Sequence, residues 1–285
     1  MTQVQWHEAP SLRRPILLVA FEGWFDAGDS ATSAVRWLAD RYDASTVANI
    51  DPEEFFDFQE TRPEVGIGPD GRTRVEWPDN RILAAQTDTA HDLLLLAGVE
   101  PRLQWRTFCH SLLEVVVETS TELVITVGSF VAAVPHSRAA PIQGSASDPT
   151  LASRLGLSRP SYQGPTGIVG VLHDTLDGAG VPIMSLRASV PHYVSGPTNP
   201  KGQQALLRRL NTVLGVQTWP ERLDSTVRDW EERVDSAIAT DEEVLEYVHR
   251  LEQDADLRSR NELVSGDDLA DEIERFLRDR DDPQP

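Results

Sequence analysis

The segment Ile16-Leu-Leu-Val-Ala-Phe21 decides the fold, because it is an unbroken apolar run bounded by Pro15 and Gly23. A strand with one face in water alternates apolar and polar side chains, and this run does not alternate. Such runs are typical of strands buried on both faces, in parallel sheets that helices cover on either side. We therefore predict a central parallel strand of an α/β fold.

A helix is predicted after this strand and its loop. Over residues 30–42 the apolar side chains fall on one helical stripe, and Asp26 or Asp29 can cap the first turn. The alternation of strands and helices continues to residue 214 and predicts a layered α/β fold with a mostly parallel sheet. The further predicted strands are 81–86, 92–97, 122–130 and 181–190, and the further helices are 102–119, 167–180 and 200–214.

The last part of the chain differs from the rest in composition. Residues 221–285 hold 22 acidic and 9 basic residues, against 24 and 17 in residues 1–220. We therefore place a boundary near Trp219-Pro220. The prediction is a core domain over residues 10–220 and an acidic helical extension over residues 221–285.

Three helices are predicted in this extension, from apolar residues spaced three and four apart. The first has Trp230 as its main anchor, the second begins at a capping box over Thr240–Glu243, and the third follows Ser265. Their apolar faces either cover the protein's own core or a subunit interface, or form an arm that recognises a partner. These faces are Leu223, Val227, Trp230, Val234 and Ile238; Val244, Tyr247, Val248 and Leu251; and Leu269, Ile273, Phe276 and Leu277.

The net charge of −20 argues against several classes of function. It repels phosphate backbones and anionic lipids, so neither nucleic acid nor a membrane is an expected partner. No apolar run approaches the ~20 residues that span a bilayer, and residues 1–10 do not resemble a signal peptide, so we expect a cytoplasmic protein. Cys109 is the only cysteine and Lys201 the only lysine. We therefore expect no thiolate metal site, no lysine-based phosphate loop and no cofactor.

Three ligand-binding candidates follow the predicted central strand. Glu22, Asp26 and Gly28 lie where open α/β sheets place ligand sites. The spacing of Gly23 and Gly28 resembles that of a phosphate loop, but Asp29 stands where such a loop needs lysine. The competing interpretation is structural, with a carboxylate that caps the following helix.

Two later loops hold the other candidates. His136 and Arg138, followed by hydroxyl residues, can accept an anion and transfer a proton. Gly164, Thr166 and Gly167 form a glycine-rich entry to a helix, where free backbone N–H groups can hold an anion. The structural alternatives are an ordinary loop for the first and a tight turn capped by the Thr166 hydroxyl for the second. No catalytic residue is assigned.

Four segments together resemble a known family. They are Pro15–Trp24 with Asp26-Ala-Gly28, Asp51–Phe58 with Thr61-Arg-Pro63, Val134-Pro-His-Ser-Arg138, and Gly164-Pro-Thr-Gly167. In this order they look like the proteasome assembly chaperone 2 family, in particular its actinobacterial branch, over roughly residues 10–215. The resemblance implies a three-layer α/β/α architecture related to that of nucleoside phosphorylases. It also implies homo-oligomers and, in eukaryotic and archaeal relatives, a role in assembling proteasome rings.

We therefore expect a non-enzymatic protein that resembles an assembly chaperone and acts through protein–protein contacts, with proteasome subunits as candidate clients. Among homo-oligomers we favour a trimer. The alternative is a binding protein or enzyme for nucleoside-like small molecules, using a cleft at the carboxyl ends of the strands near Asp26, His136, Arg138 and Thr166. An enzyme requires a deep pocket where these residues converge, whereas a chaperone presents a broad surface patch.

Overall fold

The apolar run at residues 16–21 lies in β2 (Ile16–Glu22), inside an eight-stranded sheet. The computed structural model describes residues 3–159, 162–194, 196, 198–259, 273, 275, 276 and 278. β2 pairs in parallel with β7 (Leu93–Val99) on one side and β8 (Leu123–Ala132) on the other. The predicted central strand is therefore confirmed.

The sheet is parallel at its centre and antiparallel towards both edges. Its order is β1-β3-β6-β7-β2-β8-β10-β9, and β10 (Ile183–Pro191) extends the parallel part beside β8. The remaining strands pair with antiparallel neighbours: β1 (Val4–Trp6), β3 (Ser45–Ile50), β6 (Asn80–Ala85) and β9 (Ile142–Ala146).

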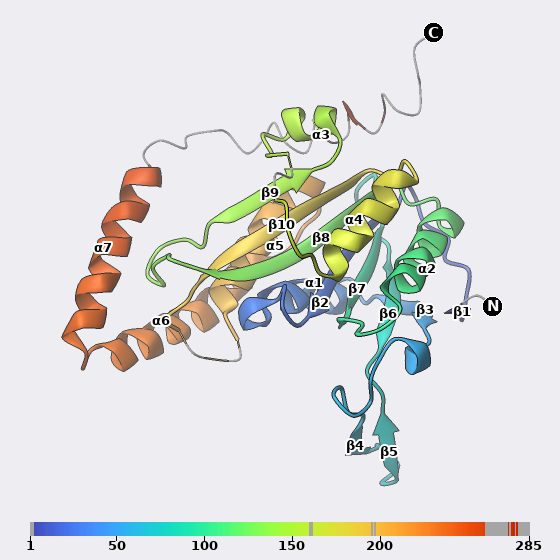
Figure 1. The fold of residues 1–285 in the computed structure, drawn as a ribbon, viewed down its shortest axis with the longest axis horizontal. Helices are drawn as coiled ribbons and strands as arrows, with labels where there is room; N and C mark the ends of the chain where they lie inside the picture. Colours follow the sequence, from blue (N-terminus) through green and yellow to red (C-terminus); the bar gives the residue numbers. More distant parts are fainter. Residues whose placement is uncertain are drawn as a thin grey trace.

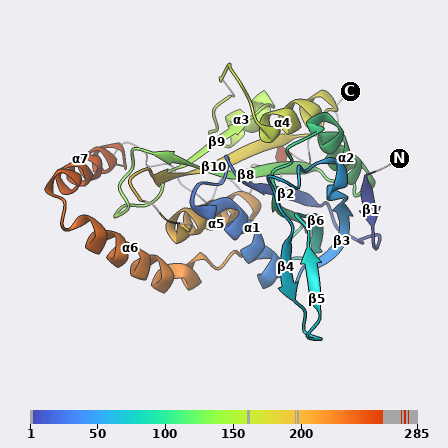
Figure 2. The same cartoon turned by 60° about the horizontal axis from the view of Figure 1, so that its bottom comes forward.

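Helices cover both faces of the sheet, as Figure 2 shows. The side chains of β2 alternate between two cores, because Leu18 packs in one core and Leu17 in the other. This two-sided burial explains why the run does not alternate in hydrophobicity. The three-layer α/β/α class is confirmed. One layer holds α1 (Ser30–Arg41) and α5 (Pro200–Leu214), and the other holds α2 (Trp105–Glu118) and α4 (Ile168–Gly178).

Several short elements were not predicted. The strands β1, β3 and β9 and the helix α3 (Pro149–Arg154) lack the long apolar pattern that predicts the central elements. β4 (Glu64–Ile67) and β5 (Thr73–Glu76) form a separate two-stranded hairpin. This hairpin projects away from the body of the molecule (Figure 1).

Two of the three predicted acidic helices are described, as α6 (Asp224–Ile238) and α7 (Glu242–Ser259), after the short helix η3 (Pro220–Leu223). The capping box predicted at Thr240 is wrong, because the Asp241 carboxylate accepts the first-turn N–H groups of α7 instead. The third helix, with Leu269 and Leu277, falls mainly outside the described residues. Its described members Ile273 and Phe276 are helical and buried in the core that α1 and α5 cover. In the described part of the chain, every helix is too short or too polar to span a membrane.

Candidate functional site

Asp26 caps the helix that follows the central strand. Its carboxylate accepts the N–H groups of Ala31, at 2.7 Å, and Thr32, at 3.3 Å, and also the Thr32 hydroxyl. The Ser129 hydroxyl of β8 lies 3.3 Å from the same carboxylate. Burial raises the pKa of Asp26, and these hydrogen bonds oppose the rise. Of the two predicted caps, Asp26 therefore fills the role and Asp29 does not.

Gly28 and Glu22 lie in two further environments. Gly28 has a φ of 63°, and a Cβ there would lie 2.7 Å from the Cβ of Asn199, whose N–H donates to the Gly28 carbonyl. This glycine therefore allows the loop before α5 to pack closely. Glu22 is half-exposed, forms an ion pair with Arg36 and lines a pocket of about 500 Å³ that also contains Trp77.

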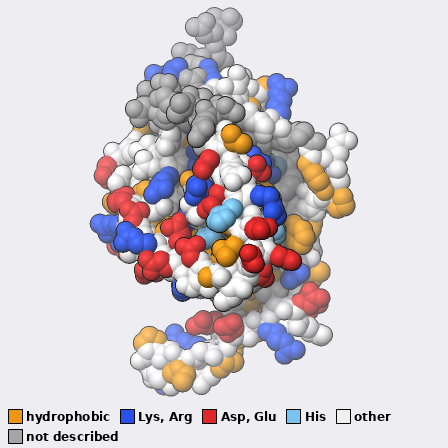
Figure 3. Space-filling model, turned by 90° about the vertical axis from the view of Figure 1, so that its left-hand side faces the viewer, with side chains coloured by type: hydrophobic (Ala, Val, Ile, Leu, Met, Phe, Trp, Pro, Cys, Tyr) orange, Lys and Arg blue, Asp and Glu red, His pale blue; other side chains and the backbone are white. Residues whose placement is uncertain are grey.

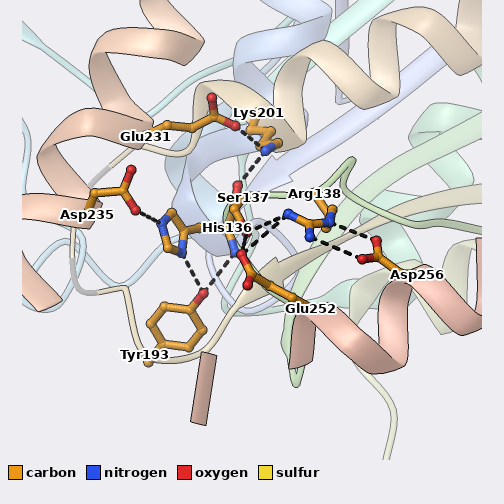
Figure 4. A network of polar contacts seen from close by, with 9 residues as sticks. All are labelled: His136, Ser137, Arg138, Tyr193, Lys201, Glu231, Asp235, Glu252 and Asp256. Carbon is orange, nitrogen blue, oxygen red and sulfur yellow. Dashed lines mark hydrogen bonds and ion pairs between the residues drawn. The ribbon is translucent and has the colours of Figure 1, made fainter. Parts of the chain in front are cut away.

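His136 is buried beneath the acidic extension (Figure 4). Its Nδ1 lies 2.7 Å from the Tyr193 hydroxyl and its Nε2 lies 2.9 Å from an oxygen of Asp235 on α6. The backbone N–H of His136 also donates to the Tyr193 hydroxyl, at 2.8 Å. This pattern fits the tautomer with its proton on Nε2, which donates to Asp235 while Nδ1 accepts from Tyr193. Both ring nitrogens therefore have partners inside the chain.

The residues after His136 bind the next helix of the extension. Arg138 makes a two-point ion pair with Asp256 on α7, with Nε–Oδ1 at 2.8 Å and Nη2–Oδ2 at 3.1 Å. This hydrogen bonding raises the pKa of Arg138. The Ser137 hydroxyl donates to Glu252, one turn earlier on α7. We call residues 136–138 the docking loop, because their side chains bind α6 and α7.

Lys201 strengthens this contact from α5. Its ammonium donates to the backbone carbonyl of His136 and forms an ion pair with Glu231 on α6. Burial is the main influence on the pKa of Lys201 and lowers it. Trp230 is buried nearby, with its ring centroid 6.3 Å from that of His136. The acidic extension is thus held by an apolar anchor surrounded by ion pairs.

The third group of candidates lines a pocket on the opposite face of the sheet. Gly164, Thr166 and Gly167 surround a cavity of about 620 Å³ beside α4. Gly167 is the N-cap residue of α4 and no side chain caps this end, so the predicted Thr166 cap is wrong. The pocket is not lined by Asp26, His136 or Arg138. The candidates therefore do not converge on one site.

In this region Arg187 escaped sequence reasoning, and the sequence indicated for His173 only a core or surface position. Arg187 lies in β10 and faces the pocket, and His173 of α4 lies beside it. The Thr126 hydroxyl is 2.8 Å from His173 Nε2, and burial, together with the charge of Arg187, lowers the pKa of His173 to about 4. The signal was present as Ser185-Leu-Arg187-Ala-Ser189, a polar alternation within the predicted strand 181–190.

The hairpin of β4 and β5 carries an exposed apolar surface. Val65 pairs with Val75 across the two strands and Ile67 with Thr73, so these side chains share one face. Val65 is 70% exposed and Ile67 is 81% exposed. We define the hairpin face as Val65, Ile67, Val75 and Trp77. Figure 3 shows the hairpin as a projection below the body, with hydrophobic side chains on it.

The described residues contain no group of three or more His, Cys, Asp or Glu side chains arranged to hold a metal ion. Figure 3 also shows the end of the molecule formed by α6 and α7, where acidic side chains are abundant and basic ones lie among them. The candidate sites are therefore a docking loop filled by the chain itself, an open pocket beside α4, and the hairpin face.

Comparison with known proteins identifies relatives over most of the chain. A sequence model described as the PAC2 family matches residues 20–238. A PAC2 family protein from Streptomyces avermitilis is 42% identical, with a TM-score of 0.77, over 82% of this chain and 99% of that one. A Mycobacterium tuberculosis protein described as a proteasome-assembly chaperone homologue is 41% identical, with a TM-score of 0.74, over the same shares.

More distant structures share the fold alone. An archaeal proteasome activator from Pyrococcus furiosus is 17% identical, with a TM-score of 0.65, over 83% of this chain and 99% of that one. No match was found among curated proteins.

Proposed function

The chain belongs to the PAC2 family, and on this premise we propose that it acts through protein–protein contacts as an assembly chaperone-like protein, without catalysing a reaction. Its clients are proteasome subunits. The 41% identical relative from Mycobacterium tuberculosis, a proteasome-assembly chaperone homologue, supports this choice. The internal pairing of His136 and Arg138 also supports it, because neither side chain is left open for a substrate.

The hairpin face is the observation that carries the proposal. An isolated two-stranded hairpin is only marginally stable in water, and exposed apolar patches mark interaction sites. Here the apolar side chains of both strands lie on the same side of a projecting element, separate from the main sheet. A client that covers this face buries apolar surface, which favours binding. Such binding does not require the client to be positively charged, although the chain has a net charge of −20.

The test measures binding of the chain to purified proteasome α and β subunits from the same organism. It compares the wild-type chain with a Val65→Ser, Ile67→Ser double variant. Burial of each side chain is worth about 1.5–3 kcal/mol, so we expect the variant to bind at least about tenfold more weakly. We also expect the wild-type chain, and not the variant, to accelerate ring formation from these subunits.

Val117→Ser provides the matched control, since Val117 is 64% exposed but lies on α2. This control should bind subunits like the wild-type chain. The proposal fails if the wild-type chain binds neither subunit. The role of the hairpin face fails separately if the double variant binds as tightly as the wild-type chain.

Homo-oligomer formation, as a trimer, is the second part of the proposal. The sequence suggested the apolar faces of the acidic helices as the contact surface. Val227 and Trp230 of α6 and Val248 and Leu251 of α7 are instead buried within the single chain. The oligomer must therefore form through another apolar surface.

A further inference from the structure

The pocket beside α4 has a polar floor in a place where a helix-covered sheet is ordinarily apolar. It lies between α4, the strands β9 and β10, and the loop after β2, with a volume of about 620 Å³. Ser145 of β9 and Ser185 and Arg187 of β10 contribute side chains to it. Polar side chains are unfavourable in an ordinary core packed between a sheet and a helix. Their presence on the floor of this pocket therefore indicates a ligand.

Arg187 is the unusual member of this floor. Its Nε is buried without a hydrogen-bond partner, and no residue in the described ranges forms a hydrogen bond or ion pair with its guanidinium. Burial lowers the pKa of Arg187, which reflects the cost of keeping the charged form there. The Arg187 side chain is partly buried, so a guanidinium without a negative partner is unfavourable there, and the pocket leaves room for an anion to pair with it.

The carboxylates around the pocket do not supply that partner. Glu100 lies at the amino end of α4, with its Oε1 3.5 Å from the position that a Cβ on Gly167 would take. Asp174 and Asp177 line the pocket from α4, but neither pairs with Arg187. The carboxylates of the pocket therefore lie along α4, and none of them pairs with the guanidinium of Arg187.

Aromatic rings form the outer part of the same pocket. Trp24 is 93% exposed and Tyr162 is 74% exposed, although both line the cavity. Phe25 packs over Gly128 of β8, where a Cβ would lie 2.0 Å from its ring. Flat apolar surfaces at the opening and a single fork-shaped cation within suit a ligand that has both a ring and an acidic group.

We propose that this pocket binds a small organic anion, a carboxylate or a phosphate ester, whose negative group pairs with Arg187 and whose ring lies against Trp24. Binding gives the guanidinium two parallel hydrogen bonds to oxygen atoms. The site is separate from the hairpin face, and its existence does not depend on the chaperone-like role. A chaperone-like protein with this pocket carries a small-molecule site as well as a protein-binding surface.

The test measures binding of three probes to the full chain by calorimetry: inorganic phosphate, adenosine monophosphate and benzoate. Binding of adenosine monophosphate indicates a phosphate ester, and binding of benzoate indicates a carboxylate. We expect one of these two to bind more tightly than inorganic phosphate, because only they carry a ring. Arg187→Met should weaken that binding at least about tenfold. Arg81→Met, which removes an exposed arginine paired with Asp79, should leave it unchanged.

Thermal unfolding without any probe gives a second measurement. Since the guanidinium lacks a partner, Arg187→Met should raise the melting temperature while it weakens probe binding. The proposal is overturned if no probe binds the wild-type chain at millimolar concentration, or if Arg187→Met binds the probe as tightly as the wild-type chain does. It is also overturned if Arg187→Met melts at a lower temperature or does not fold, because the guanidinium would then have a structural partner.

Discussion

His173 has a partly buried imidazole that folding keeps in its neutral form. Its pKa is about 4, against an ordinary value of 6.5, so the unfolded chain binds a proton at this residue more readily than the folded chain. Folding stability linked to His173 is therefore present above pH 6.5 and is lost as the pH falls towards 4.

A His173→Gln variant tests this linkage. Between roughly pH 7 and pH 5, the wild-type chain should lose about 2 kcal/mol of unfolding free energy through His173, and the variant should not. Glutamine keeps a polar group near the Thr126 hydroxyl. Urea unfolding at both pH values measures the difference, with the exposed His249→Gln as control. Equal pH dependence in His173→Gln and the wild-type chain would contradict the linkage.

The docking loop shows how much of the chemistry of single residues could be predicted from the sequence. His136 and Arg138 were predicted to accept an anion, and each does bind a carboxylate. Those carboxylates belong to Asp235 and Asp256 of the same chain. No local pattern encodes a pairing between residues about a hundred positions apart. The residue types therefore predicted the chemistry but not the partner.

At the scale of elements, the docking of α6 and α7 combines an apolar anchor with ion pairs, and the anchor should dominate. Trp230 is buried, whereas the side chains of Arg138 and Asp256 are 39% and 49% exposed. Ion pairs at such exposure are worth about 0–1 kcal/mol and are screened by salt, while truncation of a buried aromatic residue costs about 3–5 kcal/mol.

Limited proteolysis of two variants tests this ranking. Trp230→Ala should expose the chain near Trp219-Pro220 to rapid cleavage, because α6 then loses its main buried contact. Arg138→Gln should change the cleavage rate only slightly, and high salt should leave the wild-type chain protected. Rapid cleavage of the wild-type chain at this boundary would mean that the extension is an undocked arm.

The elements found from sequence share one property, which is a long apolar pattern. β2 was predicted because its neighbours bury both of its faces, and α6 because its buried residues repeat every three or four positions. The hairpin was missed because Val65 and Ile67 are separated by a glycine in a short strand that buries nothing. Periodicity reports burial, so an element that keeps its apolar residues exposed for a partner gives little signal.

At the scale of the whole molecule, the net charge of −20 opposes self-association, so an oligomer must rest on apolar contacts. Light scattering at micromolar concentration should give the mass of a homo-oligomer, with a trimer expected. Added salt should preserve this mass, because it screens the repulsion between copies and leaves apolar contacts intact. The mass of a single chain under these conditions would contradict the prediction.

The sequence separation across the docking loop also sets an order of events during synthesis. The ribosome makes His136 before its partner Asp235, which lies 99 positions later in the chain. The interval is longer for Arg138, because its partner Asp256 lies 118 positions later. The core strands up to β10 leave the ribosome first and can pair while the loop is still bare. Arrival of α6 and α7 then completes the last charge pairs, so a nascent chain halted before residue 224 displays an uncovered cationic loop to the surrounding cell.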